Sequence, residues 1–171
     1  MSLAPRGAGL ARGAIVLALA GAALAGCAVA PIFGERTAAD GVGPVPVDAD
    51  AARRMIASYR EAHGLGPVNL DPALVRVARR QADSMARANR LSHAVSGDLS
   101  ARLAAEGLRR GAEAENVSAG YPSFERALLG WEHSPRHNDN LLYRPIRRIG
   151  IAAASAPGTR YKTFWALVMT D

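Results

Sequence analysis

The sequence contains a single cysteine, Cys27, so the chain cannot form an internal disulfide bond. It lacks a Gly-x-Ser-x-Gly elbow, which presents the nucleophile in many serine hydrolases, although Ser134 has histidines nearby in the sequence. It also lacks a glycine-rich phosphate-binding loop and any internal repeat. These absences argue against a disulfide-stabilised fold and against the common nucleophilic and nucleotide-binding chemistries.

Negative charge is in slight deficit, with 15 Asp and Glu against 21 Lys and Arg, for a formal net charge of +6. Two of the basic residues, Arg6 and Arg12, lie in a leader that we expect to be removed. The remaining excess is small, and basic pairs such as Arg147-Arg148 are typical of a solvated surface. We therefore predict no nucleic-acid partner.

Residues 1–26 have the organisation of a lipoprotein signal peptide. The apolar run from Ala14 to Ala25 is too short for the roughly 20 residues that span a bilayer, and it fits a signal-peptide core. It ends in Leu24-Ala25-Gly26-Cys27, which resembles a bacterial lipobox, whose cysteine is lipidated and becomes the mature N-terminus. The alternative is a conventional cleavage site followed by an ordinary free or buried cysteine.

Lipidation of Cys27 predicts a cell-envelope protein whose partner is a membrane, because several acyl chains give stable anchoring. Ala28 after the cysteine resembles outer-membrane sorting signals, which implies the outer membrane, facing the periplasm, in a cell with two membranes. Residues 27–48 are rich in proline, glycine and small side chains, and we predict a flexible tether there. The folded domain is then expected at residues 49–171.

The domain begins with helical patterns and ends with strand patterns. Helices are predicted from Asp48 or Asp50 to His63, from Asp71-Pro72 through Met85, from Leu99 to Glu106, and from Ser123 to Trp131. Strands are predicted around Val117, within residues 112–118, and at 146–154 and 161–169, the last two as an antiparallel hairpin. This order predicts an α+β fold with a small, mainly antiparallel sheet covered by helices.

The residues best suited to chemistry are His93, Glu115 and His137. Each follows or ends a predicted element, so we expect them to converge on one cleft. Histidine is the commonest metal ligand and carries protons near neutral pH, and glutamate serves as base, ligand or orienter. His133 lies four residues before His137, as in a zinc-binding helix, but Pro135 between them argues that the helix does not continue.

Five motifs in order resemble the bacterial branch of the CAP superfamily, which groups cysteine-rich secretory, antigen-five and pathogenesis-related proteins. They are Asn69-Leu70-Asp71 with Leu74 and Ala78, Leu91-Ser92-His93, Glu113-Ala114-Glu115-Asn116-Val117, Trp131-x-x-Ser134-Pro135-x-His137, and Ile149-Gly150-Ile151. The resemblance implies a three-layer α-β-α sandwich with a cleft lined by two histidines and two acidic residues. It assigns His93, Glu115 and His137 to that cleft.

The fourth cleft position departs from the eukaryotic pattern, because Ser134 stands where those proteins have a glutamate. Ser-Pro-x-His is itself usual in bacterial relatives, so the departure concerns mechanism. Arg136-His137-Asn138 also replaces the usual Gly-His-Arg, which removes an arginine from the family's pattern.

Two functions remain open, and with them the question of whether the protein is an enzyme. In the favoured one, the cleft of His93, Glu115, Ser134 and His137 binds a small ligand, a divalent metal such as zinc held by His93 and His137, or a cell-wall partner. In the other, the bound zinc activates water, and Glu115 is the catalytic residue that handles protons during hydrolysis of peptide or cell-wall bonds. A purely structural polar network is the third alternative.

Overall fold

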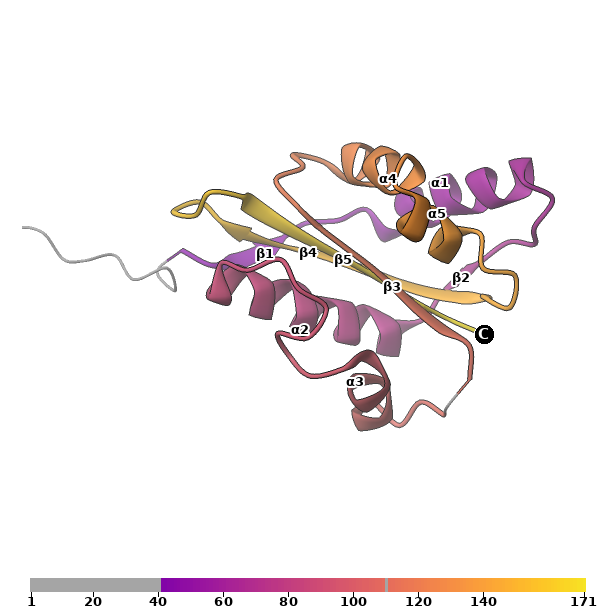
Figure 1. Ribbon diagram of the computed structural model, residues 1–171, viewed down its shortest axis with the longest axis horizontal. Helices are drawn as coiled ribbons and strands as arrows, with labels where there is room; N and C mark the ends of the chain where they lie inside the picture. Colours follow the sequence, from indigo (N-terminus) through magenta and orange to yellow (C-terminus); the bar gives the residue numbers. More distant parts are fainter. Residues whose placement is uncertain (1–40, 110) are drawn as a thin grey trace, which may run out of the picture. The chain divides into compact units, whose positions relative to one another are not determined.

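The computed structural model describes residues 41–109 and 111–171, which form five helices and a five-stranded sheet (Figure 1). The predicted signal peptide, Cys27 and the tether up to residue 40 lie outside the described residues. Within the described part of the chain, no helix has the length and apolar character needed to cross a membrane.

Polar caps and proline positions set the helix ends. Asp48 accepts a hydrogen bond from the amide of Ala51 at the start of α1 (Ala49–Ala62), and Asp71 caps α2 (Pro72–Ala88) ahead of a proline in the first turn. Asp98 caps α3 (Leu99–Ala105) and Ser123 caps α4 (Phe124–Glu132). These four helices were predicted from the sequence, and each is present.

The sheet has the strand order β1-β4-β5-β3, and β2 pairs with β4. The long strands β3 (Glu113–Ala119), β4 (Arg148–Ala156) and β5 (Lys162–Thr170) pair antiparallel, as does the short β1 (Gly43–Val45) with β4. Among the described strands of this sheet, β2 (Asn69–Leu70) is the one that pairs in parallel, with β4. This arrangement confirms the predicted α+β fold and leaves β3 as an edge strand.

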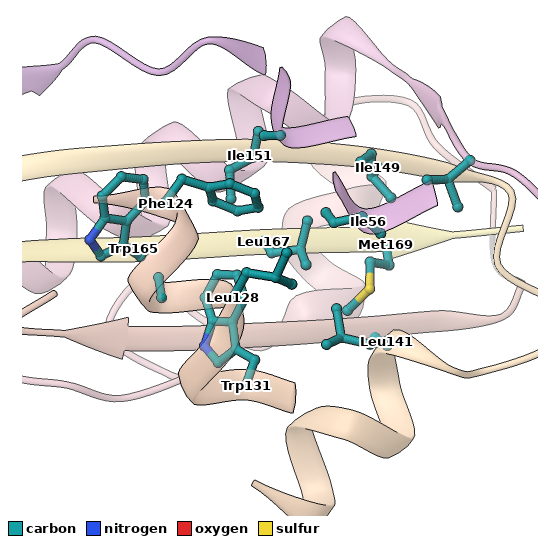
Figure 2. Packing of buried hydrophobic residues seen from close by; sticks show 14 of the residues in the cluster. Ile56, Phe124, Leu128, Trp131, Leu141, Ile149, Ile151, Trp165, Leu167 and Met169 are labelled. Carbon is teal, nitrogen blue, oxygen red and sulfur yellow. The ribbon is translucent and has the colours of Figure 1, made fainter. Parts of the chain in front are cut away.

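Helices cover both faces of the sheet, which gives the predicted three-layer sandwich: α1, α4 and α5 (Pro135–Leu141) lie over one face and α2 and α3 over the other (Figure 1). Side chains alternate between the faces along β4 and β5. The face under α1 and α4 carries bulky residues, including Ile151, Trp165 and Leu167, which pack against Phe124 and Trp131 (Figure 2).

On the opposite face, β4 presents small residues that bring α2 close to the strand. Ala152 and Ala154 of the strand pack against Ala78 and Ala82 of the helix. Gly150 lies at the closest approach, because a Cβ atom there would sit 2.0 Å from the carbonyl carbon of Leu74 and 2.2 Å from the amide nitrogen of Val75. The glycine therefore fixes the distance between helix and sheet.

The structure adds elements that the sequence analysis did not predict. Gly43–Val45, within the range assigned to the tether, pairs with Ala153–Ser155 as β1, and this backbone pairing brings Val42, Val45 and Val47 against the core. Asn69–Leu70 forms β2. Pro135 does end α4, as expected, but it also occupies the first turn of α5, where a missing N–H costs nothing.

We predict that Gly150→Ala lowers the free energy of unfolding by about 1 to 3 kcal/mol, since the added methyl group must push α2 away from β4. Chemical denaturation measures the change. Gly158→Ala is the matched control, because no atom lies within 4 Å of a Cβ at that position. An equal effect in both variants would contradict the close-contact account.

Candidate functional site

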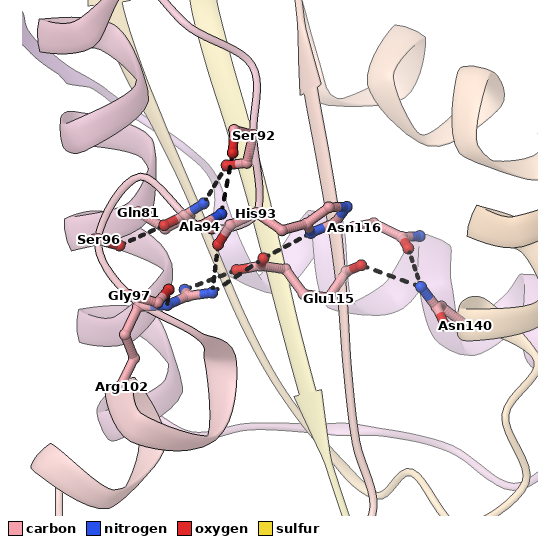
Figure 3. Close-up of polar contacts among 10 residues, drawn as sticks. All are labelled: Gln81, Ser92, His93, Ala94, Ser96, Gly97, Arg102, Glu115, Asn116 and Asn140. Atoms are coloured by element: carbon pink, nitrogen blue, oxygen red, sulfur yellow. Dashed lines mark hydrogen bonds and ion pairs between the residues drawn. The ribbon is translucent and has the colours of Figure 1, made fainter.

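The site is built on two adjacent residues of the edge strand β3. Side chains of successive strand residues point to opposite faces of a sheet, so Glu115 and Asn116 serve the two helical layers separately. Glu115 reaches toward the loop between α2 and α3, and Asn116 toward α5 (Figure 3). One dipeptide therefore positions both walls of the site.

On the first side, Glu115 is held in a buried ion pair with Arg102 of α3. Arg102 donates from Nη1 to Oε1 at 2.8 Å and from Nη2 to Oε2 at 3.1 Å. Only 5% of the Arg102 side chain and 4% of the Glu115 side chain are exposed, so water screens this pair little. Glu115 Oε2 lies 2.9 Å from Nδ1 of His93, which is 58% exposed.

Arg102 also orders the loop that carries His93. It donates from Nη2 to the carbonyl of His93 at 3.2 Å and from Nε to the carbonyl of Gly97 at 3.1 Å (Figure 3). Gln81 of α2, which is fully buried, donates to the carbonyl of Ser92 at 2.7 Å and accepts a hydrogen bond from Ser96. The His93 loop is thus fixed at several points by buried donors.

On the second side, Asn116 donates from Nδ2 to the carbonyl of His137 at 3.0 Å. Asn140 donates to Asn116 Oδ1 at 2.9 Å and to the carbonyl of Glu115 at 3.1 Å (Figure 3). The last bond satisfies a backbone acceptor on the free edge of β3, which would otherwise lack a partner strand. Amide side chains thereby dock α5 against the strand.

A buried arginine of α1 binds the backbone at the C-terminal end of α5. Arg60 of α1 is 1% exposed and donates to the carbonyls of Leu141, Tyr143 and Ile146, which follow or end α5. Tyr59 donates from its hydroxyl to Asn138 Oδ1 at 2.7 Å. The amide of Asn138 therefore ties α5 to α1.

Between the two walls lies a pocket of about 850 Å³, which we call the cleft. Its lining includes the predicted residues His93, Ser134 and His137, so the structure brings these three together. The remaining lining residues are Pro135, Arg136, Asp139 and Asn140. Glu115 lies behind His93 and is not part of the lining, and the exposed His133 is not part of it either.

The partners of the two imidazoles define their chemistry. An ionised carboxylate only accepts hydrogen bonds, so Nδ1 of His93 carries the hydrogen that bonds to Glu115, and Nε2 is the ring nitrogen that this bond leaves free. Burial, and then the proximity of His93, lower the pKa of His137 below its ordinary value. His137 is therefore unprotonated at neutral pH, and no described side chain hydrogen-bonds its ring.

Such a donor set fits a metal in part. A histidine that ligates a metal commonly donates its other N–H to a carboxylate, which is the arrangement of His93 and Glu115. Among the described residues, however, no group of three or more His, Cys, Asp or Glu side chains is placed to share one ion. The cleft therefore contains two imidazoles that could bind a metal, and the other coordination positions of that metal would be taken by water or a ligand.

Sequence reasoning missed the residue that organises the site. Arg102 lies in a helix of seven residues, which is too short for its sequence pattern to distinguish a buried arginine from a solvated one. Asp139 and Asn140 were also missed, because α5 was not predicted.

The sequence model of the cysteine-rich secretory protein family (CAP) matches residues 53–169. No curated protein matches the chain with significant similarity. Among solved structures, an outer surface protein from Borrelia burgdorferi superposes with a TM-score of 0.67 at 18% identity, covering 75% of this chain and 97% of that one.

Two further structures share the fold but belong to longer chains. An extracellular protein containing an SCP domain from Bacillus anthracis has a TM-score of 0.60 at 24% identity, covering 75% of this chain and 44% of that one. A cysteine-rich secretory protein from Staphylococcus aureus has a TM-score of 0.58 at 16% identity, with coverages of 73% and 40%. At these identities the likeness shows the fold alone.

We predict that Arg102→Met lowers the free energy of unfolding by about 3 to 5 kcal/mol, because it leaves the Glu115 carboxylate buried without its cation. Adding Glu115→Gln should recover part of this loss. Arg76→Met, which breaks the exposed pair with Glu106, should cost less than about 1 kcal/mol. Denaturation with urea measures all three. Equal losses for Arg102→Met and Arg76→Met would contradict the buried-pair account.

Proposed function

The chain belongs to the cysteine-rich secretory protein (CAP) family, and from that premise we propose that it is a lipid-anchored envelope protein whose cleft binds a ligand through His93 and His137. The main observation in support is that two histidines line one pocket from opposite walls. Glu115 of β3 bonds the His93 ring, and the next residue, Asn116, bonds the backbone carbonyl of His137. Solved structures of the same fold include an outer surface protein and an extracellular protein, which supports an envelope location.

Within this function, a divalent metal such as zinc is the ligand that the donor set favours. Nε2 of His93 is left free by the bond to Glu115, and the lowered pKa keeps His137 unprotonated at neutral pH. Bound zinc would supply a Lewis acid, and the cleft leaves room beside it for a small ligand or a cell-wall fragment.

The alternative of a zinc hydrolase needs a free base beside the metal. Glu115 was the candidate, but both of its oxygens are bonded, to Arg102 and His93, and its side chain lies behind the cleft. The bond between Glu115 and Nδ1 of His93 instead suits a residue that orients the imidazole ring. The geometry therefore favours binding over the proposed Glu115 chemistry.

Zinc should bind the full chain saturably at neutral pH, and His93→Ala or His137→Ala should weaken binding by at least about tenfold, as measured by isothermal titration calorimetry. His133→Ala is the matched control, because that exposed ring bonds to the carbonyl of Leu129, on its own helix, and lies outside the cleft lining. Wild-type affinity in both cleft variants would reject the assignment.

The anchor is tested separately. In bacterial cells Cys27→Ala should abolish incorporation of labelled palmitate, because the thiol is the proposed acceptor, whereas Val29→Ala should retain it. Labelling is read from the purified protein. Palmitate that persists in the Cys27→Ala variant would contradict lipidation at this residue.

A further inference from the structure

A second pocket, separate from the cleft, is lined by basic and hydroxyl side chains and one carboxylate. It has a volume of about 270 Å³ and lies between the second half of α2, the loop after it and α3. We call it the arginine pocket. Its lining residues are Arg80, Asp83, Ser84, Arg87, Ser96 and Arg102.

We propose that the arginine pocket binds a phosphate-class oxyanion. The lining contains three guanidinium groups and one carboxylate. The guanidinium groups come from two helices, so a tetrahedral anion in the pocket would have them on two sides. Arg80, Ser84 and Arg87 are spaced four and three residues apart on α2, which places them on one stripe of the helix. This site is independent of the function proposed for the cleft.

The donors in this pocket are not fully used by the protein. Arg87 makes no ion pair with any described residue, although Asp83 lies one helical turn before it. Ser84 likewise has no hydrogen-bond partner for its hydroxyl among the described side chains and backbone groups. Arg80 shares Glu106 with Arg76, so that carboxylate neutralises only one of the two guanidinium groups.

Arg102 has a different part in the pocket. Four of its five N–H groups are bonded, to Glu115, His93 and Gly97, and Glu115 compensates its charge, so it can contribute one remaining N–H group of Nη1. The side chain is 5% exposed and its guanidinium group is held by these bonds, so this part of the lining is rigid. The hydroxyl of Ser96 donates its hydrogen to Gln81, so Ser96 lines the pocket without offering a donor to the anion.

The test is calorimetric titration of inorganic phosphate into the full chain carrying Cys27→Ala, in a phosphate-free buffer. Saturable binding is expected, and Arg87→Ala should weaken it at least about tenfold, as the loss of a charge-assisted hydrogen bond implies. Arg90→Ala removes the same charge from an exposed position outside the lining, and Arg136→Ala removes an arginine of the cleft. Both should bind as the parent does.

A second arm separates free phosphate from a lipid headgroup. The same variants are sedimented with vesicles of phosphatidylcholine alone and of phosphatidylcholine with phosphatidylglycerol. Binding to the anionic vesicles that depends on Arg87, without binding of free phosphate, assigns the site to a headgroup and supports the proposal. Absence of Arg87-dependent binding in both arms overturns it, as does an equal loss in Arg90→Ala or Arg136→Ala.

Discussion

The buried ion pair between Arg102 and Glu115 is the constraint on which the site depends. A carboxylate and a guanidinium removed from water are stable only when their hydrogen-bonding groups are satisfied. Here Arg102 satisfies its donors with Glu115 and with the carbonyls of His93 and Gly97, so the same interaction that compensates the burial also fixes the His93 loop. The burial of the ion pair and the position of the His93 imidazole therefore depend on the same hydrogen bonds.

The pleat of β3 extends this control to the opposite wall. Asn116 follows Glu115 and points to the other layer, where it holds the backbone of His137 and the amide of Asn140. The cleft therefore keeps its width as long as β3 keeps its register with β5. That register pairs Glu115 with Val168, deep in the sheet, which ties the site to the hydrophobic core.

Much of this fold was predictable because its signals are local. Caps such as Asp71, which bonds the amide of Ala73, act within a few positions of themselves. The fold of α5 was not predictable in the same way, because Pro135 both ends one helix and starts another, and the second helix is held by distant residues such as Asn116 and Arg60. The burial of Arg102 depends on Glu115, a partner 13 residues away, so spacing alone does not reveal it.

The same contacts decide what the cleft can do. Both oxygens of Glu115 are bonded, one of them to His93, which leaves the two imidazoles as the groups that would contact the proposed ligand. The most direct measurement is anomalous diffraction from crystals soaked in zinc. The account predicts one ion bonded to Nε2 of His93 and to a ring nitrogen of His137, with the Arg102–Glu115 pair intact. An ion ligated by Glu115, or zinc bound only outside the cleft, would contradict it.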